Sequence, residues 1–278
     1  MQKPLLDVAC VQLRSSDEVG ENIETASMLV RRAQNDGARF IATPEMTSLM
    51  DRRPGALALK ARAEKDDEAL KSFQLLAGEL DIWLLIGSLP IWLNDKKCAN
   101  RSFLITPEGT IAARYDKIHM FDVELGLGQT YKESDNYTPG EKAVVADVDG
   151  ACVGMSVCYD LRFAYLYRAL AKAGADILTI PSAFTHITGE AHWHVLLRAR
   201  AIETGSFVMA PAQGGQHADG RETFGHSLII GPWGDILAEA HADPTVIHAT
   251  LDLDQVRQAR RRIPALTHDR SFTKPAKA

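Results

Sequence analysis

Three reactive side chains, Glu45, Lys117 and Cys158, each follow a stretch with a strand pattern. Glu45 closes the first strand–helix unit, Lys117 follows the first predicted hairpin, and Cys158 ends the apolar run 151–157. Ligands of open α/β sheets gather at the carboxyl ends of strands, so these side chains could meet there. A carboxylate could then take the thiol proton, the thiolate could attack a carbonyl carbon, and the ammonium could stabilise the oxyanion. The pattern therefore indicates covalent catalysis on a carbonyl compound.

Each of these residues also has an ordinary structural explanation. Cysteine is among the residues most often buried in cores, a Pro before Glu45 is typical of a helix start, and Lys117 could form a surface ion pair with Asp116. A helical pattern over residues 164–173 follows Cys158, and the N-terminus of a helix favours an anion. If Cys158 is the nucleophile, we therefore expect its thiol to have a depressed pKa.

The scaffold around these residues alternates strand patterns with helical patterns. Strands are predicted over 5–13, 39–42, 82–93, 176–181, 206–210, 226–230, 235–240 and 246–253, hairpins over 101–113 and 144–158, and helices over 22–34, 61–80, 163–173, 191–203 and 254–262. This alternation is typical of an α/β fold with mixed sheets, each covered by helices on one face. The sequence shows no linker or repeat, so we expect a single domain over residues 1–278. The long irregular stretch 122–140 predicts a functional loop.

Composition excludes several classes of protein. The 31 Lys and Arg against 36 Asp and Glu give a formal net charge of −5, which argues against nucleic-acid binding. The basic cluster 257–262 is typical of a solvated helix face or an oligomer contact. Four scattered cysteines indicate a reducing compartment, and no apolar run approaches the ~18 residues of a membrane span. The N-terminal residues are too polar for a signal peptide, so we expect a cytoplasmic protein that contacts no membrane.

Three motifs together resemble the nitrilase superfamily of carbon–nitrogen hydrolases over nearly the whole chain. They are Thr43-Pro44-Glu45, Tyr115-Asp116-Lys117-Ile118-His119 and the run from Gly154 to Phe163 that contains Cys158. The resemblance implies a four-layer α-β-β-α sandwich with two mixed sheets. It also implies a catalytic triad of Glu45, Lys117 and Cys158, with Glu133 as a further catalytic glutamate in the long loop.

The residues around the cysteine are similar to the amidase branch that contains omega-amidases and deaminated glutathione amidases. Cys158-Tyr159-Asp160 replaces the Cys-Trp-Glu usual in true nitrilases, and the runs 182–184 and 198–204 are more like deaminated glutathione amidases. The resemblance implies hydrolysis of a small carboxylate-bearing amide through a Cys thioester, with release of ammonia. Deaminated glutathione is the expected substrate. The alternatives are an omega-amidase acting on 2-oxoglutaramate or 2-oxosuccinamate, an N-carbamoyl amino acid amidohydrolase, and a silent binding subunit.

The resemblance further implies a homodimer or higher homo-oligomer, and a reaction that needs no cofactor. Candidate substrate-binding residues are Tyr159, Arg162, Thr185 and Thr188. Arg162 could bind a substrate carboxylate or could only brace the turn after the cysteine.

The chain departs from the family pattern at three places near these motifs, namely Glu190, His194 and the pair Ala164-Tyr165. The departures leave the choice of acyl group open. His192 and His194 lie two apart on the predicted helix and do not share a face. No metal site is therefore predicted from this pair.

Overall fold

The computed structural model describes residues 5–93, 97–126 and 130–274, so the ends of the predicted single domain, 1–4 and 275–278, lie outside this part of the chain. The first of two six-stranded sheets has the order β16 (Thr245–Asp252), β1 (Leu5–Gln12), β2 (Phe40–Ala42), β3 (Trp83–Trp92), β4 (Cys98–Ile105), β5 (Ile111–Asp116). The second has the order β15 (Ile236–Glu239), β14 (Leu228–Ile230), β11 (Phe207–Ala210), β10 (Ile177–Thr179), β9 (Ala151–Met155), β8 (Val144–Val148).

Both sheets are mixed, as predicted. In the first sheet β1, β2 and β3 are parallel, and β16, β4 and β5 pair antiparallel at the flanks. In the second sheet β9, β10 and β11 are parallel, and β8, β14 and β15 pair antiparallel. Glu45 lies three residues after the parallel strand β2, and Cys158 lies three residues after the parallel strand β9, so both side chains lie beyond the carboxyl ends of central strands.

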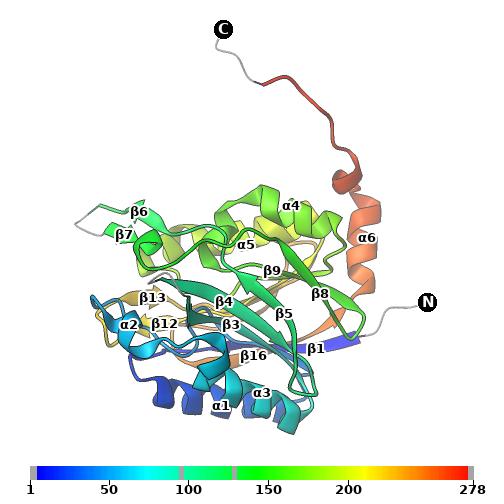
Figure 1. The fold of residues 1–278 in the computed structure, drawn as a ribbon. Helices are drawn as coiled ribbons and strands as arrows, with labels where there is room; N and C mark the ends of the chain where they lie inside the picture. Colours follow the sequence, from blue (N-terminus) through cyan, green and yellow to red (C-terminus); the bar gives the residue numbers. More distant parts are fainter. Residues whose placement is uncertain (1–4, 94–96, 127–129, 275–278) are drawn as a thin grey trace.

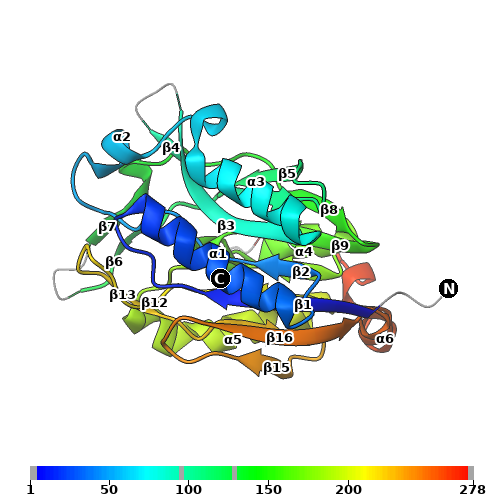
Figure 2. The same ribbon diagram turned by 90° about the horizontal axis from the view of Figure 1, so that it is seen from below.

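Helices cover the outer face of each sheet. The helices α1 (Val19–Asn35) and α3 (Glu68–Leu80) lie on the first sheet, and α4 (Ala164–Lys172) and α5 (His186–Thr204) lie on the second (Figures 1 and 2). In α1 the buried residues Ala26, Leu29, Val30 and Ala33 recur at helical spacing, so one apolar stripe faces the sheet. The four layers confirm the expected α-β-β-α sandwich.

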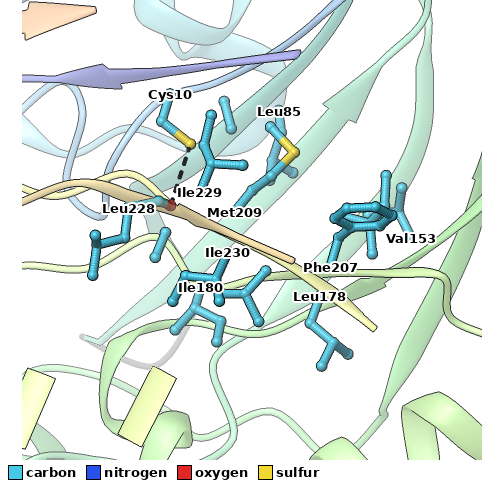
Figure 3. Close-up of a cluster of buried hydrophobic side chains, with 14 of the residues drawn as sticks. Cys10, Leu85, Val153, Leu178, Ile180, Phe207, Met209, Leu228, Ile229 and Ile230 are labelled. Carbon is cyan, nitrogen blue, oxygen red and sulfur yellow. Dashed lines mark hydrogen bonds between the residues drawn. The ribbon is translucent and has the colours of Figure 1, made fainter. Parts of the chain in front are cut away.

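The inner faces of the two sheets pack against each other and form the largest apolar core. Cys10 and Leu85 from the first sheet meet Val153, Phe207 and Leu228 from the second (Figure 3). The Sγ atom of Cys10 lies 4.0 Å from the carbonyl oxygen of Leu228, and burial raises the pKa of this thiol. Cys10 is therefore an unreactive core residue, in keeping with the usual behaviour of buried cysteines.

Two predicted helices have different starts in the structure. The pattern over 61–80 is helical only from Glu68, where α3 begins, because the Asp67 carboxylate accepts the N–H of Leu70 at 2.8 Å and caps the helix there. A 3-10 turn at Glu64–Asp66 precedes α3, and the short helix α2 (Ala56–Lys60) lies before the predicted range. Helix α5 starts at His186 rather than at residue 191, with Thr185 as its N-cap. The last helix, α6 (Asp254–Arg262), has the predicted bounds.

The predicted loop 122–140 contains a small hairpin of β6 (Asp122–Glu124) and β7 (Thr130–Lys132), followed by one 3-10 turn at Glu133–Asp135. Its residues 127–129 lie outside the described residues. A second hairpin, β12 (Gly214–Gln216) with β13 (Glu222–Phe224), lies near the same end of the molecule (Figure 1). Among the described helices, none combines the length and apolar character that crossing a membrane requires.

Gly87 in β3 allows a close approach of three segments. A Cβ atom at this position would lie 2.1 Å from the carbonyl oxygen of Thr43 and 2.5 Å from Cβ of Pro181. Thr43 precedes the Glu45 turn of the first sheet, whereas Pro181 follows β10 of the second. The missing side chain therefore lets the two sheets converge where the reactive residues lie.

Candidate active site

The four predicted catalytic side chains lie in one cluster. The Nζ atom of Lys117 lies 2.9 Å from Oε1 of Glu45 and 2.9 and 2.8 Å from the two carboxylate oxygens of Glu133. The Cys158 thiol lies close enough to the Glu45 carboxylate for this carboxylate to raise the pKa of the thiol, and both residues line the same cavity. Lys117 is 2% exposed and Glu45 is 4% exposed, so their interaction is only weakly screened by water.

The carboxylate of Glu45 is held at both oxygens. Oε1 contacts Lys117, and Oε2 accepts the backbone N–H of Ala183 at 2.9 Å. The backbone of Glu45 is fixed as well, because its carbonyl oxygen accepts a hydrogen bond from Nε2 of Gln213 at 3.0 Å. These contacts leave the carboxylate little freedom to turn away from the thiol, which suits a general base.

Lys117 follows β5 directly and is fixed by the two neighbouring segments. Its N–H donates to the carbonyl oxygen of Asn100 at 3.0 Å, and its own carbonyl oxygen accepts the N–H of Gly140 at 2.8 Å. The second contact anchors the end of the loop that carries Glu133. Oε2 of Glu133 also accepts the N–H of Phe121 at 2.7 Å, so both ends of this loop hold the glutamate beside the ammonium.

Cys158 lies at the tip of a sharp turn, three residues beyond the end of β9. Its φ of 50° places a non-glycine residue in the left-handed region, and its N–H donates to the carbonyl oxygen of Pro181 at 2.9 Å. Such strained conformations cluster at active sites. The turn is the 3-10 segment Cys158–Arg162, and α4 begins only at Ala164. The thiol therefore does not sit at the N-terminus of the predicted long helix.

The expected depression of the Cys158 pKa is wrong. Burial and the neighbouring Glu45 carboxylate raise the pKa of the thiol well above its ordinary value, although Lys117 acts in the opposite direction. Burial would lower the pKa of Lys117, but the carboxylates of Glu133 and Glu45 raise it well above its ordinary value. The resting cluster thus pairs a neutral thiol with a charged ammonium, and the thiol must lose its proton during the reaction.

Asn100 is a member of this cluster that sequence reasoning missed. Its Nδ2 lies 2.9 Å from Oε1 of Glu45 and 3.1 Å from Oε1 of Glu133, and the side chain is fully buried in β4. Its Oδ1 is buried without a hydrogen-bond partner among the described residues. The sequence carried no clear signal for it, because Arg101 and Ser102 follow it in the same strand and Asn100 does not stand out as a polar residue there.

Asp160 connects the nucleophile turn to the strand that carries the lysine. Its fully buried carboxylate accepts Tyr115 Oη at 2.6 Å and the N–H of His119 at 3.0 Å, both next to Lys117 in sequence. It also accepts the N–H of Val157 at 2.9 Å, beside Cys158. These bonds link the two sheets and fix how the turn sits relative to the ammonium.

A cavity of about 350 Å³ opens onto the cluster. Its lining contains all four predicted catalytic residues and three of the four predicted binding residues, namely Tyr159, Thr185 and Thr188. Arg162 is outside this lining. Its guanidinium lies over the rings of Tyr159 and Phe184, 5.8 and 5.4 Å from their centroids, and contacts His192 Nδ1 at 3.3 Å. These contacts favour the role of Arg162 as a brace of the turn over its role as a carboxylate ligand.

Sequence reasoning also missed the cationic residues of the cavity, Arg52, Lys132 and Arg221. Arg221 follows the turn of the β12–β13 hairpin, where its Nε donates to the buried carboxylate of Asp219 at 2.8 Å. Within residues 5–93, 97–126 and 130–274, no side chain or carbonyl pairs with its two Nη atoms. A guanidinium fixed on one side and open on the other can bind a carboxylate with two parallel hydrogen bonds.

All three departures from the family pattern lie outside the cavity lining. Glu190 is exposed on α5, Tyr165 hydrogen-bonds through Oη to Nε2 of His119, and His194 contacts Glu239 at 2.8 Å. His192 and His194 turn to different partners, Arg162 and Glu239, so the two histidines do not form a metal-binding pair.

The site contains the parts of a cysteine hydrolase acting on a carbonyl group: a thiol, an adjacent base, an ammonium and a cavity. Comparison with known proteins agrees with this class. The Carbon-nitrogen hydrolase family matches residues 7–261. The chain belongs to this family, and it is an amidohydrolase.

The similar proteins are named amidases or nitrilase-superfamily members. The deaminated glutathione amidase of Yersinia enterocolitica is 35% identical over 95% of this chain and 93% of its own, and that of Homo sapiens is 39% identical over 95% and 82%. The crystal structure of Saccharomyces cerevisiae Nit3, a member of branch 10 of the nitrilase superfamily, superimposes with a TM-score of 0.87 at 28% identity, covering 98% of each chain. These matches extend over both sheets.

Proposed function

We propose that the protein hydrolyses the amide bond of deaminated glutathione, with Cys158 as the nucleophile. The observation that carries this proposal is that Cys158, Glu45 and Lys117 line one cavity, with Lys117 Nζ 2.9 Å from Oε1 of Glu45. The names of the similar amidases support the substrate. The cavity volume of about 350 Å³ falls within the range of small-molecule sites and favours a small linear amide.

In the first step Glu45 takes the proton of Cys158 as the sulfur attacks the amide carbonyl carbon. The proton transfer leaves the total charge of the cluster unchanged, which avoids burying a net additional charge. The new oxyanion lies between the Lys117 ammonium and the backbone N–H of Tyr159. The first N–H groups of a helical turn lack an intrahelical acceptor, so the Tyr159 N–H is available as a donor.

In the second step the protonated Glu45 gives its proton to the leaving nitrogen, and the C–N bond breaks to leave a thioester on Cys158. Glu45, again a carboxylate, then removes a proton from the water that attacks the thioester. The carboxylic acid is released, and the thiol recovers its proton. Glu133 positions Lys117 throughout, through the contacts of 2.9 and 2.8 Å with Nζ.

The substrate is expected to bind as an anion. Deaminated glutathione carries two carboxylates and has lost the only ammonium of glutathione, so cationic groups in the cavity favour it. Arg221 is the best-placed partner, because Asp219 holds its Nε and leaves the outer face of the guanidinium toward the cavity. Arg221→Gln should raise KM about 10- to 100-fold with a smaller effect on kcat, consistent with loss of a hydrogen bond to a charged group.

The leaving group distinguishes this proposal from its alternatives. Deaminated glutathione contains only secondary amides, so its hydrolysis releases an amine and not the ammonia expected from the sequence. In contrast, 2-oxoglutaramate, 2-oxosuccinamate and N-carbamoyl amino acids release ammonia. One assay panel should measure both products for all four substrate types, with Cys158→Ala as the control. We expect the highest kcat/KM for deaminated glutathione. A far faster release of ammonia from 2-oxoglutaramate would assign the omega-amidase reaction instead, and normal turnover by Cys158→Ala would exclude the thioester mechanism.

A further inference from the structure

We propose that His194, His226 and Glu239 bind one divalent transition-metal ion of the Zn²⁺ class, on the outer side of the cavity wall. The residues come from three elements that are distant in sequence: His194 from α5, His226 from the segment before β14, and Glu239 from the end of β15. The three candidate ligand atoms all lie within 4.8 Å of one another. Two imidazoles and a carboxylate form a ligand set that zinc uses in proteins.

The spacing of the ligand atoms approaches that of a metal site. Oε1 of Glu239 lies 2.8 Å from Nε2 of His194 and 3.1 Å from Nδ1 of His226. With metal–ligand bonds of about 2.0–2.1 Å, tetrahedral ligands lie about 3.3 Å apart. The ion would replace the two hydrogen bonds that Glu239 accepts, and the Glu239 oxygen would need to move only slightly away from each imidazole nitrogen. A fourth position would remain for water, because the three side chains are 33%, 26% and 34% exposed.

The His226 ring is held in place without an ion. The backbone of His226 has a φ of 53°, its N–H donates to the carbonyl oxygen of His241 at 3.0 Å, and its carbonyl oxygen accepts Nε1 of Trp193 at 2.7 Å. Its ring stacks on Phe224 with a centroid separation of 4.3 Å, and the His194 ring meets the same Phe224 edge-on. Ligands that are fixed by packing and backbone contacts lose less entropy when a metal binds.

The His194–His226–Glu239 cluster lies next to the wall of the cavity. Phe224, which supports both rings, belongs to β13, and the preceding residue Thr223 lines the cavity. A bound ion would tie α5 to β15 across this hairpin. His194 is one of the departures from the family pattern, and its partners are 32 and 45 residues away. The sequence offered no spacing that would reveal the site.

Metal binding should be measured directly, by calorimetric titration of chelator-treated protein with ZnCl₂. The protein should carry Cys158→Ala, because a free thiol is itself a zinc ligand. We expect one strong site per chain. His194→Ala and the nearly isosteric Glu239→Gln should each weaken it at least about tenfold, whereas His192→Ala, on the same helix outside the cluster, should bind as tightly as the parent.

Two further measurements make the result decisive. Co²⁺ should give the visible absorption of tetrahedral coordination in the parent protein and lose it in Glu239→Gln. In protein with Cys158 intact, His194→Ala should retain amidase activity, because the cluster does not line the cavity. Absence of a strong site in the parent, or equal zinc affinity in the parent and Glu239→Gln, would overturn the proposal and leave a hydrogen-bonded His–Glu–His cluster.

Discussion

Asn100 donates one hydrogen bond from Nδ2 to Glu45 at 2.9 Å, in the buried space where Lys117 contacts the same carboxylate oxygen. The same Nδ2 reaches Glu133 at 3.1 Å, so one amide bridges two carboxylates that would otherwise repel each other. Asn100 is not among the residues that line the cavity, so it acts as a positioning residue.

Replacing Asn100 should therefore impair catalysis through Glu45. In Asn100→Leu the bridging donor is lost, and in Asn100→Asp a third carboxylate joins the cluster, so both changes disfavour the charged form of the base. We expect kcat to fall at least about tenfold and the acidic limb of the pH–rate profile to move to higher pH, more in Asn100→Asp. A lower kcat with an unshifted profile in both variants would show that Asn100 only stabilises the fold.

Lys117→Ala should reduce kcat/KM by a factor of about a hundred or more, as expected when one oxyanion donor is removed. The loss has a second cause, since Lys117 is the only cation that contacts Glu45 and Glu133 among the described residues. Steady-state kinetics with circular dichroism as the folding control would measure this effect. Near-normal activity would exclude the proposed role of Lys117.

The Cys158 thiol should remain protonated at pH values where an ordinary cysteine has ionised, because burial and Glu45 raise its pKa. The thiolate absorbance near 240 nm, as a difference between the wild type and Cys158→Ala, should therefore appear only above the usual cysteine range. Glu45→Gln should lower the pKa of the Cys158 thiol, because the neighbouring negative charge is removed. A thiolate signal at neutral pH in the wild type would contradict the raised pKa of the Cys158 thiol.

The raised pKa of the Cys158 thiol also makes the free energy of unfolding depend on pH. In the unfolded chain the thiol ionises above about 8.5, whereas in the folded protein it keeps its proton. The unfolded state is thus favoured increasingly as the pH rises above that value. We expect the free energy of unfolding to fall more steeply between neutral and alkaline pH in the wild type than in Cys158→Ala, as measured by urea denaturation.

Gly87→Ala should destabilise the protein by about 1–3 kcal/mol, the usual cost of overpacking, because the added Cβ meets the Thr43 carbonyl oxygen at 2.1 Å. Gly20 in α1 is the matched control, since a Cβ there meets no atom within 4 Å and should stabilise the helix by roughly 0.5–1 kcal/mol. Thermal unfolding of the two variants should therefore shift in opposite directions. A neutral Gly87→Ala variant would show that the strand moves to accommodate the methyl group.

The sequence predicted the parts of the site that depend on local pattern. Strand ends and motifs identify Glu45, Lys117 and Cys158, the alternation of elements predicts mixed sheets, and the family resemblance implies two of them. Contacts between segments that are distant in the sequence could not be predicted from the pattern. The Arg221–Asp219 pair and the cation it presents depend on a hairpin whose register the pattern does not reveal. The thiol pKa was predicted in the wrong direction, because its main causes are burial and a carboxylate more than a hundred residues away.

The division of the site between the two sheets has a consequence for biosynthesis. Glu45, Lys117 and Glu133 lie in the first half of the chain, whereas Cys158 and the Asp160 carboxylate that joins it to Tyr115 lie in the second. N-terminal segments generally leave the ribosome and begin to fold first. A nascent chain that ends before residue 158 holds the acid–base apparatus without a nucleophile. Two separately expressed fragments, divided near residue 142, would recover amide hydrolysis only when both sheets associate, so enzymatic turnover would report their assembly.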